Sequence, residues 1–391
     1  MLKNILWTVS SRYGAQALAI LSNVWLARVL GADGFGEYAL ASAVLLVGNA
    51  FTNFGMDMIL IRKLSVTDVP WLLIDGLGGQ LFLSVVYVGG IFFAGEFWPI
   101  PPLVKLYTLA LFPLSFYSIF TIAVRARGQM ALYSLAQLLV AGLQFLAVLF
   151  LWASHGDGLA FITTMLIGHV LAALWTGGHQ QFRLEFLSPV RSFSLLKECF
   201  SMAVIGTLRL VYEKLPVTFL PVLSGYTATG LFSSALRVMD AGKLGHFSAF
   251  TAIYPEMTRN AEFGRELKGW KTLLGTAFLI AVLLFLFSEP IIYILFGAGF
   301  ISAVPLLKIL AWLVIPYVVV TYTSLGLVAM NIERPVLVSL VMTVLLLSFL
   351  LFLFSRFFGT PGAAAAVLVA ECFHAALLSM QWRFHARSKL P

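Results

Sequence analysis

The chain has 391 residues, of which 60% are hydrophobic and 11% are charged, with a mean hydropathy of +0.96 and a net charge of +8. About a quarter of the residues in a soluble domain are charged, so this composition excludes a soluble globular protein. The cations are spread singly between apolar runs, which indicates membrane orientation and argues against a nucleic acid partner. Those runs last about twenty residues, the length of a membrane-spanning helix rather than of a barrel strand. We therefore predict an all-α polytopic membrane protein.

The apolar runs predict about twelve transmembrane helices, six in each half of the chain. Glycine or proline punctuates several of the short connections between them, among them GADGFG, FWPIPP, GYTATG, FGAGF and FGTPG. In chain order, the helices are expected to begin near Ile5, Gly36, Pro70, Pro102, Met130, Gly158, Cys199, Thr227, Trp270, Val304, Pro335 and Gly362.

Lysine and arginine are distributed unequally between alternate connections. One set holds most of them, and the opposite set holds little beyond Arg28, Lys105 and Arg356 near helix ends. By the positive-inside rule the richer set is cytoplasmic. We therefore expect a protein of the cytoplasmic (inner) membrane with both termini on the cytoplasmic side. The richer set comprises Lys3, Arg62, Lys63, Arg125, Arg127, Arg183, Arg191, Arg259, Arg265, Lys268, Lys271, Arg334, Arg383, Arg387 and Lys389.

The two halves share a weak internal repeat. Residues 31–41 read GADGFGEYALA and residues 225–235 read GYTATGLFSSA, and each stretch leads into the second span of its half. With six spans per half, both halves have the same orientation, so the repeat is parallel about an axis along the membrane normal. Such repeats are typical of transporters, whose site lies near mid-membrane between the two bundles. We predict two six-helix lobes, residues 1–190 and 191–391.

Four of the predicted spans carry polar or charged side chains at helical spacing, which places each set on one helical face. A charge at the helix centre costs roughly 2.5–3.5 kcal/mol on insertion scales, so such residues tend to face a bundle interior or a watery cavity. The repeat relates spans one and two to spans seven and eight, which predicts one shared cavity. The residues are Arg12, Gln16, Asn23, Asn49, Asn53, Asp57, Arg209, Glu213, Lys214, Arg237, Asp240 and Lys243.

Local pairing accounts for some of these charges. Arg209 and Glu213 are four residues apart on one helix, a spacing at which opposite charges can pair. Arg237 and Asp240 are three residues apart and are expected to pair in the same way.

The remaining charges are mostly basic. Lys214, Lys243 and Arg12 have no local partner, and Asp57 is a candidate to offset one of them. Lys243 lies toward the expected cytoplasmic end of its span, where snorkelling is the alternative role. A net-positive cavity favours an anionic cargo, and phosphate suits it because arginine presents a fork of donors that matches phosphate oxygens.

Several stretches together resemble a known family. They are NVWLARVLGADGFGEYALASAVLLVGNAFTNFGMDMILIRKLS near the start, YPEMTRNAEFGRELKGWK, PIIYILFGAGFISAVPLLKILAW and AMNIERPVLVSL. In this order they resemble polysaccharide repeat-unit flippases of the multidrug/oligosaccharidyl-lipid/polysaccharide exporter superfamily. The likeness runs along the whole chain and is strongest in the first sixty residues and over residues 231–340.

This resemblance implies a MATE-like fold of two six-helix lobes forming a V. It also implies that the protein moves an undecaprenyl-pyrophosphate-linked oligosaccharide, an anionic cargo, between leaflets of the bilayer, with a polysaccharide polymerase or other export machinery as an expected partner. By this analogy, the substrate-binding residues are Arg12, Gln16, Asn23, Asn53, Arg209, Lys214, Arg237 and Lys243. Proton or sodium coupling is expected at Asp57, Glu213 or Asp240, with no other cofactor and no metal site.

Three alternatives stay open at the level of sequence. A cation-coupled multidrug exporter of the same superfamily would favour surplus acidic residues in the spans, whereas this chain has surplus basic ones. A lipid II flippase would use the same positive cavity, although its usual members have more spans. A membrane-embedded polymerase or ligase would carry a sizeable external loop with catalytic groups. No Walker-type loop, zinc signature or nucleophile motif is present, so we do not predict an enzyme.

Overall fold

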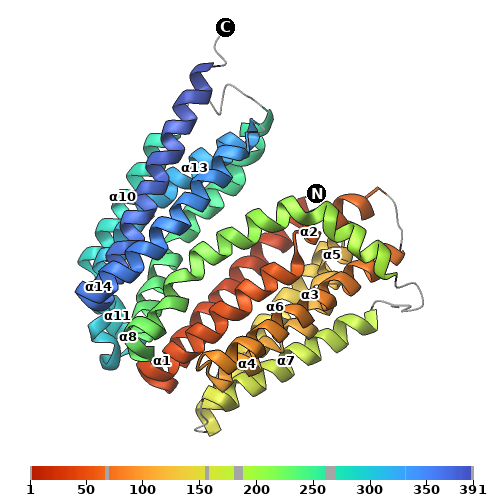
Figure 1. Cartoon of the computed structure of the whole chain (residues 1–391), viewed down its shortest axis with the longest axis horizontal. Helices are drawn as coiled ribbons and strands as arrows, with labels where there is room; N and C mark the ends of the chain where they lie inside the picture. The colour runs from red at the N-terminus through yellow and green to blue at the C-terminus, as the bar shows by residue number, and fades with distance from the viewer. Residues whose placement is uncertain are drawn as a thin grey trace. The chain divides into compact units, whose positions relative to one another are not determined.

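A computed structural model of the chain describes residues 2–66, 70–154, 158–179, 188–259, 269–330 and 332–388. Within those ranges every regular element is a helix, as Figure 1 shows. The all-α prediction is therefore confirmed for the described residues. The helices form two compact units, residues 1–214 and residues 215–391.

The first unit is a bundle of long apolar helices (Figure 1). In it α1 contacts α3, α4 and α6, while α5 contacts α2, α3 and α7. The helices are α1 (Leu2–Asn53), α2 (Met56–Leu64), α3 (Pro70–Phe97), α4 (Pro102–Thr108), α5 (Leu111–Ala126), α6 (Met130–Ser154), α7 (Gly158–His179) and the first part of α8 (Pro189–Arg259).

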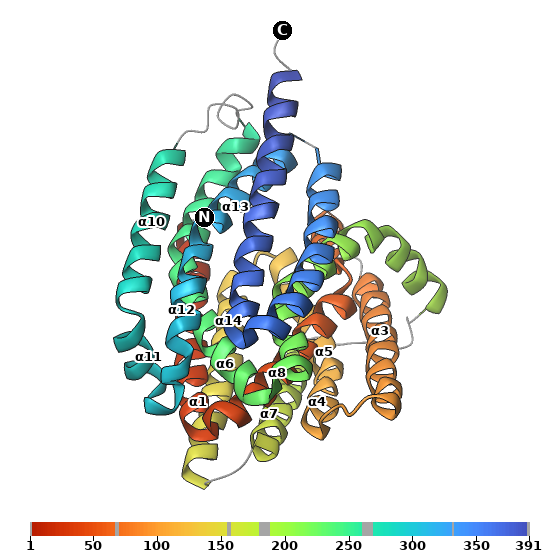
Figure 2. The same ribbon diagram turned by 60° about the vertical axis from the view of Figure 1, so that its left-hand side comes forward.

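The second unit contains the rest of α8 and the helices that follow it (Figure 2). Here α13 packs against α10 and α14, and Trp382 lies so close to Gly326 that a methyl group there would be 2.0 Å from its ring. The further elements are α10 (Trp270–Leu286), α11 (Ser288–Phe296), η2 (Ala298–Ala303), α12 (Val304–Leu310), η3 (Ala311–Leu313), α13 (Val314–Ala329) and α14 (Arg334–Ser388).

Three helices are about twice as long as the roughly twenty residues that a bilayer requires. The apolar stretches of α1, α8 and α14 are 41, 49 and 51 residues long. Each contains one glycine outside the helical region, Gly31, Gly225 or Gly359. If each of these helices counts as two spans, and the pair α10 and α11, bent by 69°, counts as one, the described residues contain twelve spans.

These glycines lie in the short connections predicted at GADGFG, GYTATG and FGTPG, and each connection is a break at one residue. The chain is helical on both sides of each break, and the helical conformation is interrupted at a single glycine. Gly31 has φ 67° and ψ −178°, a combination open almost only to glycine because it has no Cβ. Gly225 has nearly the same conformation, with φ 85° and ψ 174°. The two are the first residues of the repeated motifs, so the repeat extends to an unusual backbone conformation.

The helix that contains the seventh span begins at Pro189, whereas its candidate membrane-spanning stretch begins at Met202, near the predicted start at Cys199. Proline suits the first turn of a helix because its missing N–H needs no partner there. The charged residues of this stretch suggested a connection, but Leu195 and Leu196 are buried together with Cys199 against Met56. The contacts therefore place the start of α8 in the first unit.

The predicted lobes and the compact units are defined differently. The units divide at residues 214 and 215, inside α8, because the first part of that helix packs on the first unit. The lobes 1–190 and 191–391 were inferred from the internal repeat, and that boundary stays a prediction.

Candidate functional site

A break between α1 and α2 positions the acidic side chain of the second span. Phe54 and Gly55 both have positive φ, 50° and 71°, which ends one helix and starts the next. A methyl group on Gly55 would lie 2.8 Å from the Cβ of Met202, so the close approach of α8 also requires glycine. Asn53 Oδ1 accepts a hydrogen bond of 3.3 Å from the backbone N–H of Asp57. Asp57 therefore lies in the first turn of α2.

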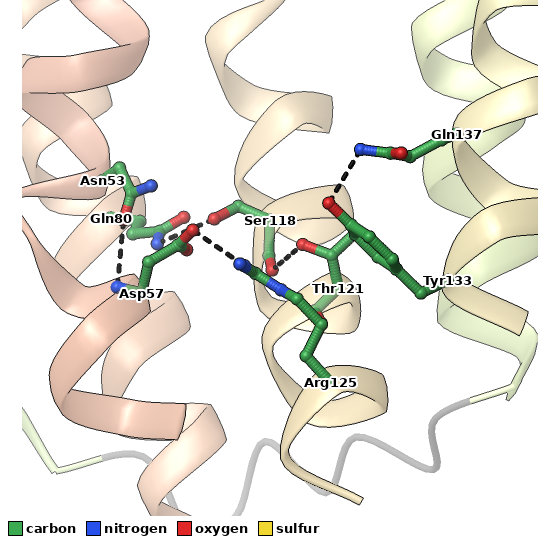
Figure 3. A network of polar contacts seen from close by, with 8 residues as sticks. All are labelled: Asn53, Asp57, Gln80, Ser118, Thr121, Arg125, Tyr133 and Gln137. Atoms are coloured by element: carbon green, nitrogen blue, oxygen red, sulfur yellow. Dashed lines mark hydrogen bonds and ion pairs between the residues drawn. The ribbon is translucent and has the colours of Figure 1, made fainter. Parts of the chain in front are cut away.

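Asp57 forms an ion pair with an arginine from another helix. Nη2 of Arg125, in the last turn of α5, donates to Asp57 Oδ2 at 2.7 Å (Figure 3). Nε of the same guanidinium donates to the Thr121 carbonyl at 3.1 Å. Its central carbon lies 5.4 Å from the centre of the Tyr133 ring, at a distance typical of a cation–π contact. The guanidinium is thus held from three sides.

Further polar groups extend this network over α2, α3, α5 and α6 (Figure 3). Gln137 Nε2 donates to the Tyr133 hydroxyl at 2.7 Å, and Gln80 Nε2 donates to Ser118 Oγ at 3.2 Å. Thr121 Oγ1 donates to the Ser118 carbonyl at 2.8 Å. Buried polar groups are costly unless they are hydrogen-bonded, so this network both joins the helices and offers donors and acceptors in an otherwise apolar unit.

A second ion pair fixes the start of α8 to α3. Asp75 is 1% exposed and accepts hydrogen bonds from Arg191 Nε at 2.6 Å, Arg191 Nη2 at 3.4 Å and the Ser188 backbone N–H at 3.1 Å. The Arg191 guanidinium also lies 4.8 Å from the centre of the Trp71 ring. A carboxylate with three such bonds is fully paired, which is what a buried charge requires.

A third pair joins α2 and α8 nearby. Lys63 Nζ is bonded to Glu198 Oε2, and both side chains are partly exposed. The adjacent Cys199 precedes the candidate span that starts at Met202. Burial raises the pKa of the Cys199 thiol to about 11, with a smaller contribution in the same direction from Glu198 and an opposing one from Lys63. This thiol therefore stays protonated near neutral pH and is unreactive.

The predicted substrate residues of the first span show local roles where their side chains are described. Arg12 lies in α1, in a stretch whose side chains are outside the described residues. Gln16 is exposed, and Asn23 Nδ2 donates to the Ala19 carbonyl of its own helix at 2.6 Å. The Asn53 side chain accepts from the first turn of α2, as described above.

The seventh span carries the ion pair that its spacing predicted. Arg209 Nε lies 3.3 Å from Glu213 Oε1, with side chains 64% and 46% exposed. Lys214, the next residue, is half-buried. Arg209 and Glu213 are thus both exposed on the surface of the described helix.

In the eighth span an ion pair forms within one helical turn. Asp240 Oδ1 is bonded to Lys243 Nζ at 3.3 Å, so Lys243 has a local partner that its spacing did not predict. Lys243 Nζ also lies 4.7 Å from the centre of the Tyr317 ring. Arg237 is half-buried, with its Nε enclosed. Lys243 is therefore held within the second unit rather than simply extended toward an interface.

The nearby His246 ties α8 to α10. His246 Nε2 lies 3.2 Å from the Leu273 carbonyl and 3.0 Å from Thr276 Oγ1. A carbonyl oxygen can only accept, so Nε2 carries the proton, and the buried ring is a packing contact.

The structure therefore brings together some of the predicted residues. Asn53 meets Asp57, Arg209 meets Glu213, and Asp240 meets Lys243. Asp57 forms its ion pair with Arg125, a residue outside the predicted set. The shared cavity would combine residues of both units, and it stays a prediction.

Arg125, Tyr133 and Gln137 were missed as site residues. Arg125 was counted only among the cytoplasmic cations, because it lies just before the RGQM connection. The signal that could have found it is Asp57, an acidic residue with no basic partner on its own helix face. Among the described residues, no three His, Cys, Asp or Glu side chains gather as a metal site.

Comparison with known proteins decides the family. A family model described as polysaccharide biosynthesis protein matches residues 1–261, about two thirds of the chain. The chain belongs to this family. No curated protein sequence gives a significant match.

Solved structures share the fold at low sequence identity. An inward-facing multidrug resistance MATE family transporter of the MOP superfamily superposes with a TM-score of 0.79 at 17% identity, over 95% of each chain. The lipid II flippase MurJ, in an inward closed conformation, gives 0.78 at 14% identity, over 97% of this chain and 87% of MurJ.

A third match is a MOP superfamily transporter from Pyrococcus furiosus, described as having a binding pocket of reversed polarity. Its TM-score is 0.69 at 15% identity, over 98% of this chain and 94% of the other. The predicted relation to polysaccharide biosynthesis proteins is thus confirmed, and so are the MATE-like fold and the multi-pass membrane class.

Proposed function

We propose that the chain moves undecaprenyl-pyrophosphate-linked oligosaccharide repeat units from the cytoplasmic to the outer leaflet, for export of a surface polysaccharide. The main support is membership of the polysaccharide biosynthesis family together with a fold shared with flippases and exporters. A charged headgroup cannot cross hydrocarbon unaided, so the proposed route is alternating access. On this proposal the chain is a transporter, not an enzyme, and a polysaccharide polymerase or export complex is its expected partner.

The charges of the seventh and eighth spans support an anionic cargo. In the seventh span Arg209 and Lys214 outnumber Glu213, and in the eighth span Arg237 and Lys243 outnumber Asp240 in the same ratio. The exposed guanidinium of Arg209 shares only one bond with its carboxylate, so donors remain for phosphate. We propose that Arg12, Lys214, Arg237 and Lys243 contribute to the same headgroup site, with Gln16, Asn23 and Asn53 beside it.

The excess of basic residues argues against a cation-coupled multidrug exporter, because its cationic substrates would favour an excess of acidic residues in the spans. The basic excess does not separate repeat-unit transport from lipid II transport, since both cargoes carry a pyrophosphate. Family membership favours the former. This leaves lipid II flipping as the nearest alternative function.

Ion coupling is proposed at Asp57, Glu213 or Asp240. Each of these carboxylates is paired with a base, so uptake of a proton or a sodium ion would have to compete with that pair. Glu213 and Asp240 are the more exposed, with side chains 46% and 51% accessible. The response of export to collapse of the proton or sodium gradient, compared between wild type and Glu213→Gln, tests this role, and an unchanged response would remove Glu213.

Genetic complementation tests the cargo class. We expect the wild-type chain to restore surface polysaccharide in a strain lacking its own repeat-unit flippase, because family and charge both fit that cargo. The readouts are surface glycan and the amount of lipid-linked repeat unit held inside the cell.

Two parallel strains supply the controls. Rescue of a strain depleted of its lipid II flippase, without glycan export, would reassign the cargo to lipid II. Drug resistance in an efflux-deficient strain, without glycan export, would reassign it to cationic drugs.

A further inference from the structure

The Arg125 guanidinium has donors that the first unit does not use. Arginine has five N–H donors, and two of them are bonded, to the Thr121 carbonyl and to Asp57. Among the described residues, Nη1 and the second proton of Nη2 have no hydrogen-bond partner. The side chain is 24% exposed, so the guanidinium belongs to a side chain that is not sealed inside the bundle.

The geometry also fixes the guanidinium before any ligand arrives. Its central carbon lies over the Tyr133 ring, and its Nε donates to the preceding turn of α5. Figure 3 shows Arg125 between Asp57 and Tyr133. A preorganised arginine loses little freedom on binding, and its planar fork matches two oxygens of a phosphate.

The bond between Arg125 and Asp57 differs from the bond between Arg191 and Asp75 in the same unit. Asp75 is buried and receives Arg191 through two nitrogens, together with the Ser188 N–H. Asp57 receives Arg125 through one nitrogen, and its side chain is 33% exposed. Opening the Asp75–Arg191 pair would leave a buried carboxylate without a partner. Asp57 is partly exposed, so its carboxylate can be hydrated when Arg125 moves away.

The position suits a lipid headgroup. Arg125 lies in the last turn of α5, at an end of the bundle that the distribution of lysine and arginine predicts to be cytoplasmic. At that end, the diphosphate of a lipid in the cytoplasmic leaflet would be at the same depth as the guanidinium.

We propose that Arg125 is an entry site for the diphosphate of the lipid-linked cargo, and that the cargo displaces Asp57 from the guanidinium. This rests on the proposed function. In the empty protein Asp57 neutralises Arg125, which suppresses binding of unrelated anions. When the diphosphate arrives, its oxygens take the Nη donors and the carboxylate is released to water. Asp57 thus sets the affinity of the site.

A double-mutant cycle on headgroup binding tests this exchange. The purified chain in nanodiscs is titrated with undecaprenyl pyrophosphate and, separately, with inorganic pyrophosphate. Asp57→Asn should bind the lipid about tenfold more tightly, because the competitor is gone, and Arg125→Gln about tenfold more weakly. The double variant should bind like Arg125→Gln, since Asp57 acts only through Arg125.

A purely structural pair gives a different pattern. Both single variants would then lower the thermal midpoint and weaken binding alike, and the charge-neutral double variant would recover wild-type binding, which would overturn the proposal. The double variant also keeps the test informative if Arg125→Gln alone fails to fold. The matched control is Lys63→Gln/Glu198→Gln, a pair of α2 and α8 outside the proposed site, which should leave binding unchanged.

The outcomes of these titrations distinguish failure of the proposed entry site from failure of the proposed function. Lipid binding that ignores Arg125 overturns the entry site and leaves repeat-unit transport standing. Failure of the wild type to bind undecaprenyl pyrophosphate contradicts the proposed function itself. Binding of inorganic pyrophosphate alone, even if it depends on Arg125, overturns the lipid headgroup as the ligand.

Discussion

Asp57 and Asp75 are carboxylates in neighbouring helices of the first unit, and each bonds to an arginine from another helix. Neither partner could be predicted from spacing, because Arg125 is 68 residues from Asp57 and Arg191 is 116 residues from Asp75. The pair Arg209 and Glu213 could, since they are four residues apart on one helix. Sequence reasoning therefore found the local pair and missed the tertiary ones.

Neutralising the basic residues of the proposed substrate site should stop export. We expect Arg209→Gln and Arg237→Gln each to lower surface polysaccharide by about tenfold or more, because each removes charge-assisted hydrogen bonds to phosphate. Membrane abundance and the thermal midpoint of Arg209→Gln should stay at wild-type values, because that side chain is 64% exposed. Surface glycan staining measures the effect.

The control for this prediction is Arg62→Gln, an exposed cation outside the proposed site, which should export normally. Lysine at position 209 or 237 should recover part of the export, since it keeps the charge but not the fork. Wild-type export by both glutamine variants would remove these arginines from the site.

At the scale of elements, the sequence predicted the helices better than their connections. The starts at Pro70, Pro102, Met130, Gly158 and Trp270 were predicted correctly, because proline, glycine or the apolar pattern marks each one. Short connections were expected at three glycine-rich stretches, and each is a break at one glycine of positive φ. Composition reveals that a glycine is present, but it does not reveal whether one residue or six will form the turn.

Replacing the glycines at the helix breaks should lower the stability of the protein. Gly31→Ala or Gly225→Ala should lose about 1–3 kcal/mol of stability, because a side chain is strained at that φ and ψ. No neighbouring atom lies within 4 Å of a Cβ at either position, so the cost comes from the backbone alone. Thermal unfolding of the purified protein in detergent measures the loss.

Helical glycines in equally open surroundings provide the control. Gly90→Ala in α3 and Gly275→Ala in α10 also meet no atom within 4 Å, and neither glycine has a positive φ. Both should be neutral or stabilising by about 0.5–1 kcal/mol, because alanine favours the helix. Equal effects at all four positions would show that the breaks at Gly31 and Gly225 carry no special strain.

At the scale of the whole molecule, composition was sufficient for the membrane class and the helical fold. The order of loose motifs along the chain indicated the family, which the match over residues 1–261 then established. The cargo was less accessible to sequence reasoning, since the same fold serves a multidrug transporter and a lipid II flippase. A fold does not determine the substrate. The basic residues favour a phosphorylated cargo, and a transport measurement is needed to test whether they bind it.

The most direct test of the central claim is transport in vesicles that contain only the purified chain and an undecaprenyl-pyrophosphate-linked oligosaccharide. A membrane-impermeant glycosidase added outside digests the oligosaccharides of the outer leaflet. With the wild-type chain present, we expect digestion to continue until the inner-leaflet lipid is also consumed, while vesicles carrying Arg209→Gln/Arg237→Gln stop at the outer-leaflet share. Digestion that stops at the outer-leaflet share with the wild-type chain, as in vesicles without protein, would contradict the account.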